Sequence, residues 1–444
     1  MLERKVISDF IKWKNSNDKK ALLVTGARQI GKTFAIEQFA KKNYDNVLKI
    51  NFITTPSASE IFAGDLDVDG IITGLTAFSK MPLVKNKTLI FFDEIQECPR
   101  ARTAIKFLVE DGRFDYIESG SLLGVNYKEV PSYPVGYEEV IQMYPMDFEE
   151  FLWANNIQKE TIEYLQKCFA ERKVVNEAVH QTVMKLFKYF IIVGGMPDVV
   201  QNFVNTHDVA VALQIQKNIL ALYRQDISKY AVNDKEKIKD IFDIIPSELN
   251  TKNKRFMLSD INPSARMNRY ESSFMWLNDS GVALPCYNIR EPKIPLKINE
   301  LRNLMKVYMN DTGLLCSSAV DNVQYEILKG NLNVNMGSIL ENTMAQLLFA
   351  NKFSLRYFDR KDLGEVDFVL ERRNEITLLE IKSGKNYKAH SALDKIFVNR
   401  EWKIKDAIVL CSGNVELQDD VTYLPWYMVQ FIKPVSLPAR LIVK

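Results

Sequence analysis

The chain has 444 residues, which is too many for one ordinary hydrophobic core and suits two to four domains. Hydrophobic residues make up 47% and charged residues 26%, a composition that excludes a disordered, fibrous or disulfide-stapled protein. The formal charge of +2 neither implies nor excludes a polyanionic partner.

Cysteines and histidines are few and scattered. The five cysteines and three histidines form no close group, so a zinc site, a disulfide framework and a histidine-based triad are not expected. Residues 1–20 contain no apolar signal segment, and no apolar run approaches the roughly 18 residues needed to cross a bilayer. We therefore expect a cytoplasmic protein without a membrane partner.

Residues 20–42 form a short apolar run that ends in glycine, followed by a pattern of helical spacing. Between them lies a match to G-x-x-x-x-G-K-[ST], in the strand-to-helix context that this motif requires. Its glycines let successive backbone N–H groups face phosphate oxygens. The sequence thus predicts an ATP-binding loop made of Gly26, Ala27, Arg28, Gln29, Ile30, Gly31, Lys32 and Thr33.

Two side chains of this loop have defined chemistry. Lys32 would reach the β- and γ-phosphates, and the Thr33 hydroxyl would ligate Mg²⁺. The alternative is a plain glycine-rich turn that happens to carry a lysine, and the flanking strand and helix patterns count against it.

Further apolar runs at 47–52, 88–92 and 116–117 alternate with helical stretches, a pattern that predicts a parallel sheet covered by helices on both faces. The second run ends in Asp93 and Glu94. Asp93 would hold the magnesium and Glu94 would polarise the attacking water, because hydrolysis needs both a metal and a base beside the γ-phosphate. The alternative is a strand end with two solvated acids.

The third run leads into a polar turn, where Ser119 or Ser121 would contact the γ-phosphate or the water. A polar turn without function explains this segment equally well. We predict that residues 1–155 form the nucleotide-binding α/β domain.

From Pro145 the texture changes to long amphipathic stretches, which predict a helical region over 156–235. Residues 236–320 contain three short helical patterns and then a strand pattern, an order that suits a winged helix-turn-helix. This region carries a basic cluster of Lys252, Lys254, Arg255, Arg266 and Arg269. The cluster would neutralise DNA phosphates, although a solvated helix face explains it equally well.

Residues 321–444 return to a mixed pattern of a helix and strands, which predicts a third core. Two strand-like runs, 365–370 and 378–382, form an apparent hairpin. Pairing brings Asp367 near Glu380, although one residue of slip decides whether the two face each other.

An acid and an amine, Glu380 and Lys382, share one face of the second strand, because side chains alternate along a strand. Asp367 and Glu380 would hold Mg²⁺ while Lys382 orients or deprotonates water, an arrangement that suits phosphodiester cleavage. Glu341, on the preceding helix, would add a further carboxylate. The alternative is the wet face of an edge hairpin.

With these motifs in view, the chain resembles the bacterial and archaeal AAA-type ATPases that carry a C-terminal domain of unknown function related to restriction endonucleases. The resemblance rests on the segments GARQIGKT, FFDEIQECPRA, SGS, YPMDFEEFL, GGMPDVV, LALYRQDISKY, GEVDFVL and LLEIKSG. It implies an α/β multidomain protein with a P-loop AAA-type parallel sheet, a helical lid, a winged-helix-like region and a C-terminal restriction-endonuclease-like domain.

The resemblance assigns the ATPase roles given above to Lys32, Thr33, Asp93 and Glu94. It makes Ser119 or Ser121 a sensor residue. It places Asp367, Glu380 and Lys382 on the PD-(D/E)xK motif and Glu341 on the helical acid. Activity at that motif is a separate question, because the fold also occurs as an inactive binding platform.

One position departs from the family. Many relatives have Gly-Arg shortly before the YPMDFEEFL segment, where this chain has Gly136 and Tyr137. An arginine acting on the ATP of a neighbouring copy therefore cannot be assigned there. Arg100, Arg102 and Arg113 stay candidates that salt bridges explain equally well, so homo-oligomerisation is left open.

The sequence favours a magnesium-dependent ATPase coupled to a DNA-handling module with a candidate nuclease site. A second interpretation is an ATP-dependent switch whose C-terminal domain binds a protein or a nucleic acid without cutting it. A kinase or GTPase is a third, and the acidic strand tip and the missing guanine-reading motif N/T-K-x-D count against it.

Overall fold

The computed structural model describes residues 2–121, 132–231, 234–251, 254–318, 336–372, 374–384, 386–397, 399–402, 404–418 and 420–435. The chain divides into two compact units. The N-terminal unit comprises Glu3–Tyr144 and Asp279–Gly281, and the C-terminal unit comprises Met1–Leu2, Pro145–Asn278 and Val282–Lys444. Within the described ranges, no helix is long and apolar enough to cross a membrane.

The N-terminal unit contains a five-stranded sheet of order β2-β3-β4-β1-β5 in which every pair is parallel. Its strands are β1 Ala21–Thr25, β2 Asn46–Asn51, β3 Thr88–Asp93, β4 Asp115–Ser119 and β5 Glu138–Gln142. β1 and β3 are buried along their whole length, which is why both are continuous apolar runs. The α/β prediction for this region is confirmed.

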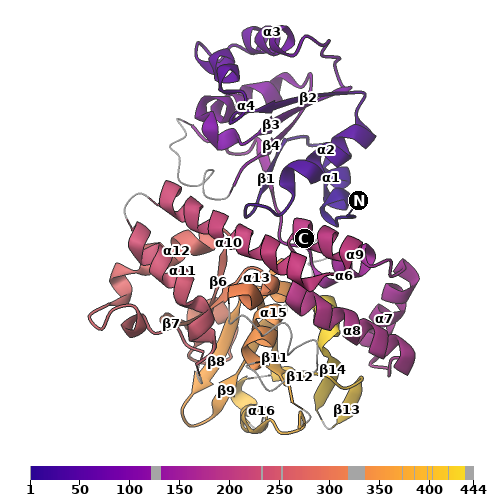
Figure 1. Ribbon diagram of the computed structural model, residues 1–444, viewed down its shortest axis with the longest axis vertical. Helices are drawn as coiled ribbons and strands as arrows, with labels where there is room; N and C mark the ends of the chain where they lie inside the picture. Colours follow the sequence, from indigo (N-terminus) through magenta and orange to yellow (C-terminus); the bar gives the residue numbers. More distant parts are fainter. Residues whose placement is uncertain are drawn as a thin grey trace, which may run out of the picture. The chain divides into compact units, whose positions relative to one another are not determined.

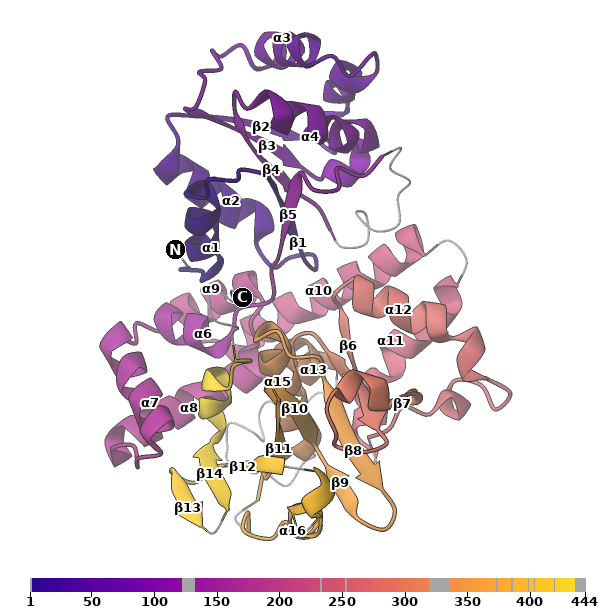
Figure 2. The same cartoon turned by 180° about the vertical axis from the view of Figure 1, so that it is seen from behind.

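Helices cover both faces of this sheet (Figures 1 and 2). One side carries α1 Val6–Lys14 and α2 Lys32–Asn43, whose Phe10 and Phe39 rings pack edge to face at 5.5 Å. The other side carries η1 Pro56–Phe62, α3 Val68–Ser79 and α4 Pro99–Asp111, which bury a second apolar cluster against the sheet. The carboxyl ends of the strands meet at one edge, where polar residues follow the buried runs.

The C-terminal unit begins with the predicted helical region. The α-helices in the described residues of this unit are α6 Phe148–Ala154, α7 Lys159–Glu171, α8 Glu177–Val193, α9 Pro197–Thr206, α10 Val209–Tyr230, α11 Lys235–Leu249, α12 Glu271–Asp279, α13 Thr312–Ser318, α15 Met336–Ala350 and α16 Ser391–Phe397. α6 starts where it does because Asp147 and Glu150 form a capping box, in which each side chain accepts the other residue's backbone N–H.

The region predicted to be a winged helix-turn-helix differs from that expectation in its middle. The second predicted helical pattern contains only a single 3₁₀ turn, Leu258–Asp260, and a further turn, Met267–Arg269, precedes α12. β6 Ala283–Ile289 and β7 Glu300–Met309 form an antiparallel hairpin. This hairpin continues into a four-stranded sheet with β8 Arg356–Arg360 and β9 Gly364–Val366. Lys252 lies outside the described residues.

A third sheet has the order β10-β11-β12-β14-β13 and packs against α15 and the 3₁₀ turn Trp426–Phe431. Its strands are β10 Phe368–Arg372, β11 Glu375–Ile381, β12 Ile404–Cys411, β13 Glu416–Gln418 and β14 Val421–Pro425. The antiparallel register of β10 and β11 pairs Phe368 with Leu379. Extended by one residue, this register puts Asp367, which directly precedes β10, opposite Glu380.

Candidate functional site

The loop between β1 and α2 depends on backbone conformations that side chains disfavour. Gly26, Gln29 and Gly31 all have positive φ, at 146°, 65° and 84°. A Cβ on Gly26 would lie 2.5 Å from the backbone oxygen of Met143, so glycine is required there by space as well as by φ. Ala27 and Ile30 are buried, Arg28 is half-buried and Gln29 is exposed.

Lys32 is the first residue of α2 and bends back over the loop. Its ammonium donates hydrogen bonds to the backbone oxygens of Gly26 and Ala27, at 3.0 and 2.9 Å. The amine therefore lies over the loop whose N–H groups would surround a phosphate, together with the N-terminus of α2.

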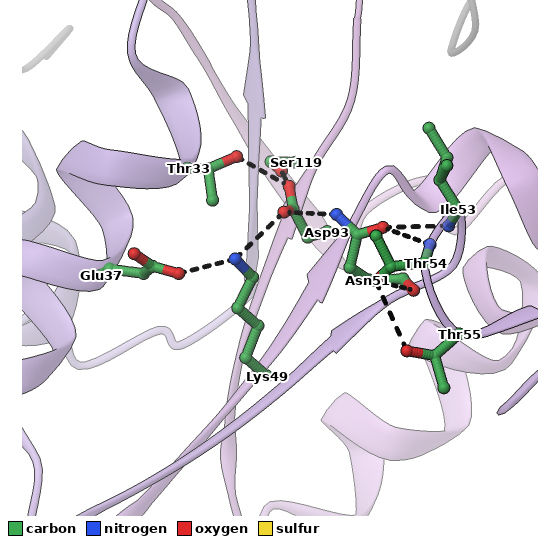
Figure 3. Close-up of polar contacts among 9 residues, drawn as sticks. All are labelled: Thr33, Glu37, Lys49, Asn51, Ile53, Thr54, Thr55, Asp93 and Ser119. Carbon is green, nitrogen blue, oxygen red and sulfur yellow. Dashed lines mark hydrogen bonds and ion pairs between the residues drawn. The ribbon is translucent and has the colours of Figure 1, made fainter.

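Asp93 is the centre of the polar edge, as Figure 3 shows. Its Oδ1 accepts hydrogen bonds from the hydroxyls of Thr33 and Ser119, at 3.0 and 2.5 Å. Its Oδ2 accepts one from the Asn51 amide at 2.9 Å and lies 3.4 Å from the Lys49 ammonium. The carboxylate is only 2% exposed, so these four side chains replace water around it.

Glu94 follows Asp93 in a left-handed conformation, with φ of 56°. Its Oε2 accepts a hydrogen bond from the Gln96 amide at 2.5 Å. Ser121 is buried two residues beyond Ser119. Of the residues predicted for this site, Thr33, Asp93 and Ser119 are therefore in direct contact, through the hydrogen bonds to Asp93.

Three contributors to this site were missed by the sequence analysis. Lys49 and Asn51 share one face of β2 and contact Asp93, and Lys49 also bonds Glu37 at 2.6 Å. Burial alone would lower the pKa of Lys49, but the hydrogen bond with Glu37 and the charge of Asp93 raise it above its usual value. Two polar residues at alternate positions of a strand were the available signal.

The third missed residue is Arg4, which is buried just before α1. Its guanidinium donates to the backbone oxygens of Ile30 and Tyr144, each at 2.8 Å. It thereby ties the phosphate loop to the segment that follows β5. Because the contacts span 26 and 140 residues, no local pattern could reveal them.

The residues at the sheet edge fit a nucleotide-bound magnesium ion. A hydroxyl and a carboxylate are hard oxygen donors, and those of Thr33 and Asp93 are already 3.0 Å apart. Mg²⁺ is usually held by one or two such protein ligands together with phosphate oxygens and water.

The three arginines considered as candidates for action on a neighbouring copy are all engaged within this chain. Arg102 is buried and lies 3.2 Å from Glu138. Arg100 donates to the backbone oxygens of Phe62 and Gly64. Arg113 pairs with Asp69 and Asp111 at 2.6 and 2.7 Å.

In the C-terminal unit, the predicted triad of Asp367, Glu380 and Lys382 lies at the open end of the β10–β11 hairpin, where β10 begins and β11 ends. Asp367 Oδ2 accepts a hydrogen bond from the Ile381 N–H at 2.7 Å. Glu380 Oε1 pairs with the Lys382 ammonium at 2.9 Å. Glu380 Oε2 is buried and has no hydrogen-bond partner in the described part of the chain.

Glu341 lies on α15, as predicted, and is fully buried. Its Oε1 accepts hydrogen bonds from Lys306 at 2.6 Å and from the Tyr308 hydroxyl at 2.5 Å, and its Oε2 pairs with Lys254. Although burial raises the pKa of Glu341, the charges of Lys306 and Lys254 lower it to about 2.

The carboxylates that converge differ from the predicted set. Oxygens of Glu341, Glu365 and Asp367 all lie within 4.8 Å of one another, a geometry that could hold a cation. We call these three residues the acidic cluster. Glu365 was missed by the sequence analysis, which placed Glu380 in the metal site. Burial, and then the charges of Glu380 and Glu341, raise the pKa of Asp367 well above its usual range.

Comparisons with known proteins assign three segments. Residues 18–152 match the family model of an AAA domain. Residues 184–324 and 336–429 match two domains of unknown function, DUF8612 and DUF4143. No curated protein sequence matches the chain significantly.

Among solved structures, the RuvB Holliday junction branch migration motor of Thermotoga maritima is 12% identical, with 64% of this chain and 89% of RuvB covered and a TM-score of 0.30. The Hsp104–ADP complex of S. cerevisiae is also 12% identical, with coverage of 79% and 43% and a TM-score of 0.27. PCH-2 of C. elegans is 16% identical, with coverage of 37% and 46% and a TM-score of 0.21. Likeness at this level says nothing of function. Residues 18–152 thus match an AAA domain, and the parallel sheet of the N-terminal unit fits a P-loop AAA fold.

Proposed function

We propose that the N-terminal unit binds ATP with magnesium and hydrolyses it. The observation that carries this proposal is the convergence of Thr33, Asp93 and Ser119 at the sheet edge, directly beside the loop of residues 26–33. A glycine-rich turn without function would have no reason to meet a buried carboxylate there.

Each residue has a role that follows from its position. Lys32 and the loop N–H groups bind the β- and γ-phosphates, while Thr33 and Asp93 hold the magnesium. The magnesium, when bound, neutralises charge on the phosphate oxygens. Glu94 orients and deprotonates water, and its hydrogen bond with Gln96 fixes its carboxylate until substrate binds. Ser119 lies at the tip of β4, the strand between β1 and β3. Its hydrogen bond to Asp93 links the ends of β4 and β3.

We further propose that hydrolysis is coupled to a DNA-handling C-terminal module with a restriction-endonuclease-like fold. Support comes from the order of the motifs along the chain. It also comes from the positions of three acids: Glu341 on α15, Asp367 directly before β10 and Glu380 on β11. The basic cluster gives limited support: Arg266 and Arg269 are exposed, whereas Lys254 is paired with Glu341.

A second function is favoured by a specific observation. Two lysines, Lys254 and Lys306, already pair with Glu341, the residue expected to ligate a metal. This pairing favours an ATP-dependent switch whose C-terminal domain binds a protein or a nucleic acid without cutting it.

The test is phosphate release from Mg²⁺–ATP, with and without duplex or single-stranded DNA. Lys32→Ala should lower turnover about 100-fold or more, because it removes a charge aimed at the transferring phosphoryl group. Lys42→Ala is the matched control, since Lys42 is an exposed lysine of the same helix.

Each outcome has a defined meaning. Equal background release from the native chain and Lys32→Ala would contradict hydrolysis. Turnover that depends on Lys32 but ignores DNA would leave the ATPase and remove the DNA coupling. DNA cleavage lost in Lys382→Ala would identify a nuclease, and no cleavage by the native chain would identify the switch.

A further inference from the structure

The acidic cluster of Glu341, Glu365 and Asp367 has the spacing of a divalent cation site, yet a lysine already lies in it. The Lys306 ammonium, from β7, is 2.6 Å from Glu341 Oε1 and 2.5 Å from Glu365 Oε1. It therefore bridges two of the three carboxylates that a metal would bridge.

Lys306 cannot easily leave this position. Its side chain is completely buried, and the Tyr357 ring lies 4.9 Å from the ammonium. Moving the amine to solvent would require the packing around β7 and α15 to open. It would also leave the buried Glu341 and the partly exposed Glu365 without this cation.

Other groups complete the neutralisation. Lys254 pairs with Glu341 Oε2, and the Tyr308 hydroxyl donates to Glu341 Oε1, which also accepts from Lys306. Asp367 accepts the backbone N–H of Ile381. Both oxygens of Glu341, one oxygen of Glu365 and one oxygen of Asp367 are thus already paired with donors within the chain.

Charge points the same way. Three lysines, Lys254, Lys306 and Lys382, pair with Glu341, Glu365 and Glu380. Only Asp367 lacks a lysine in these pairs. A divalent ion added to the cluster would lie beside the buried ammonium of Lys306 and the half-buried ammonium of Lys254. Positive charges that lie so close together in a low-dielectric interior repel each other strongly.

We propose that Lys306 is a built-in cation that takes the place of the metal, so that the acidic cluster binds no divalent ion. The cluster then joins β7, α15 and β9 through ion pairs and supplies no divalent ion to the nuclease-like motif of the neighbouring hairpin. This inference is independent of ATP hydrolysis in the N-terminal unit.

Binding of Mn²⁺ tests the proposal by electron paramagnetic resonance on the full, nucleotide-free chain. The native protein and Asp367→Asn should bind the same number of Mn²⁺ ions. Lys306→Met should gain one Mn²⁺ per chain, and the gain should vanish in the double variant with Asp367→Asn. Lys405→Met, which removes an exposed lysine paired with Glu375, is the matched control and should gain none.

Two results would overturn the proposal. One is a Mn²⁺ ion bound by the native chain and lost in Asp367→Asn. The other is a Lys306→Met protein that keeps the native circular dichroism spectrum and gains no ion. The first comparison does not need the lysine variant, so the proposal stays testable if Lys306→Met does not fold.

Discussion

At the scale of single residues, Asp93 shows what a sequence motif contains and what it omits. The motif predicted Asp93 and Thr33, because both lie in short local patterns. It could not predict Lys49 and Asn51, because their contact depends on how β2 registers against β3. Hydrogen bonds to a charged group contribute roughly 1.5–3 kcal/mol each, so the omitted residues matter to the carboxylate as much as the predicted ones.

Gly26 gives a prediction at this scale. Gly26→Ala places a Cβ against Met143 in a backbone conformation that alanine disfavours. Strain of this kind costs on the order of 1–3 kcal/mol, so ATP should bind about 10- to 100-fold more weakly. Titration with a fluorescent ATP analogue measures this. Gly64→Ala is the control, because a Cβ there meets no atom within 4 Å. Equal affinities of the two variants would show that the loop tolerates a side chain.

At the scale of elements, the apolar strands of the N-terminal unit were predictable and the last strand was not. β2, β3 and β4 appear where apolar runs were found. β5 has the sequence Glu-Glu-Val-Ile-Gln and an exposed or half-buried pattern, so it lacks the signal of a buried strand. Its existence depends on pairing with β1, which is a tertiary effect that local composition does not encode.

Arg4 supports a prediction about the elements around the loop. Arg4→Met leaves the buried carbonyl of Ile30 and the partly buried carbonyl of Tyr144 without their charged donor. We expect a loss of about 3 kcal/mol in the free energy of unfolding of the N-terminal unit. Hydrogen exchange at the amides of β1 measures it.

The control for Arg4 is Arg113→Met, which removes partly exposed ion pairs with Asp69 and Asp111. Pairs of this kind contribute about 0–1 kcal/mol. If both variants lose the same free energy of unfolding, the hydrogen bonds of Arg4 stabilise the unit no more than partly exposed ion pairs do.

At the scale of the whole molecule, regions that the sequence analysis separated at 156–235, 236–320 and 321–444 lie in one compact unit. Asp311, at the start of α13, accepts N–H groups from Gly195 at 2.6 Å and from Leu314 at 3.0 Å. It joins the loop between α8 and α9 to α13. The segment GGMPDVV could be noticed in the sequence, but its partner 116 residues away could not.

Asp311 predicts a pH dependence of stability. Burial raises its pKa to about 6, although N–H groups of Gly195, Leu314 and Gly313 lower it. The unfolded carboxyl titrates near 3.9, so the folded state binds the proton more tightly. Stability from this group is therefore present below about pH 4 and lost as pH rises to about 6, by about 3 kcal/mol.

Urea unfolding of the C-terminal unit between pH 4 and pH 7 measures this dependence. The Asp311→Asn variant should lack the loss of stability that Asp311 causes between about pH 4 and about pH 6. Because other titrating groups contribute equally to both proteins, the difference between the two profiles should isolate this loss. Parallel profiles for the native chain and the variant would contradict a raised pKa at Asp311.

The hydrogen bonds of Asn51 limit which amino acids can replace it. Its Oδ1 accepts the N–H groups of Ile53 and Thr54, each at 3.0 Å, while its Nδ2 donates to Asp93. Aspartate would keep the acceptor and lose the donor, serine would be too short, and glutamine would add a methylene. Position 51 therefore tolerates few replacements, and the turn after β2 and the carboxylate beside the phosphate loop are expected to evolve together.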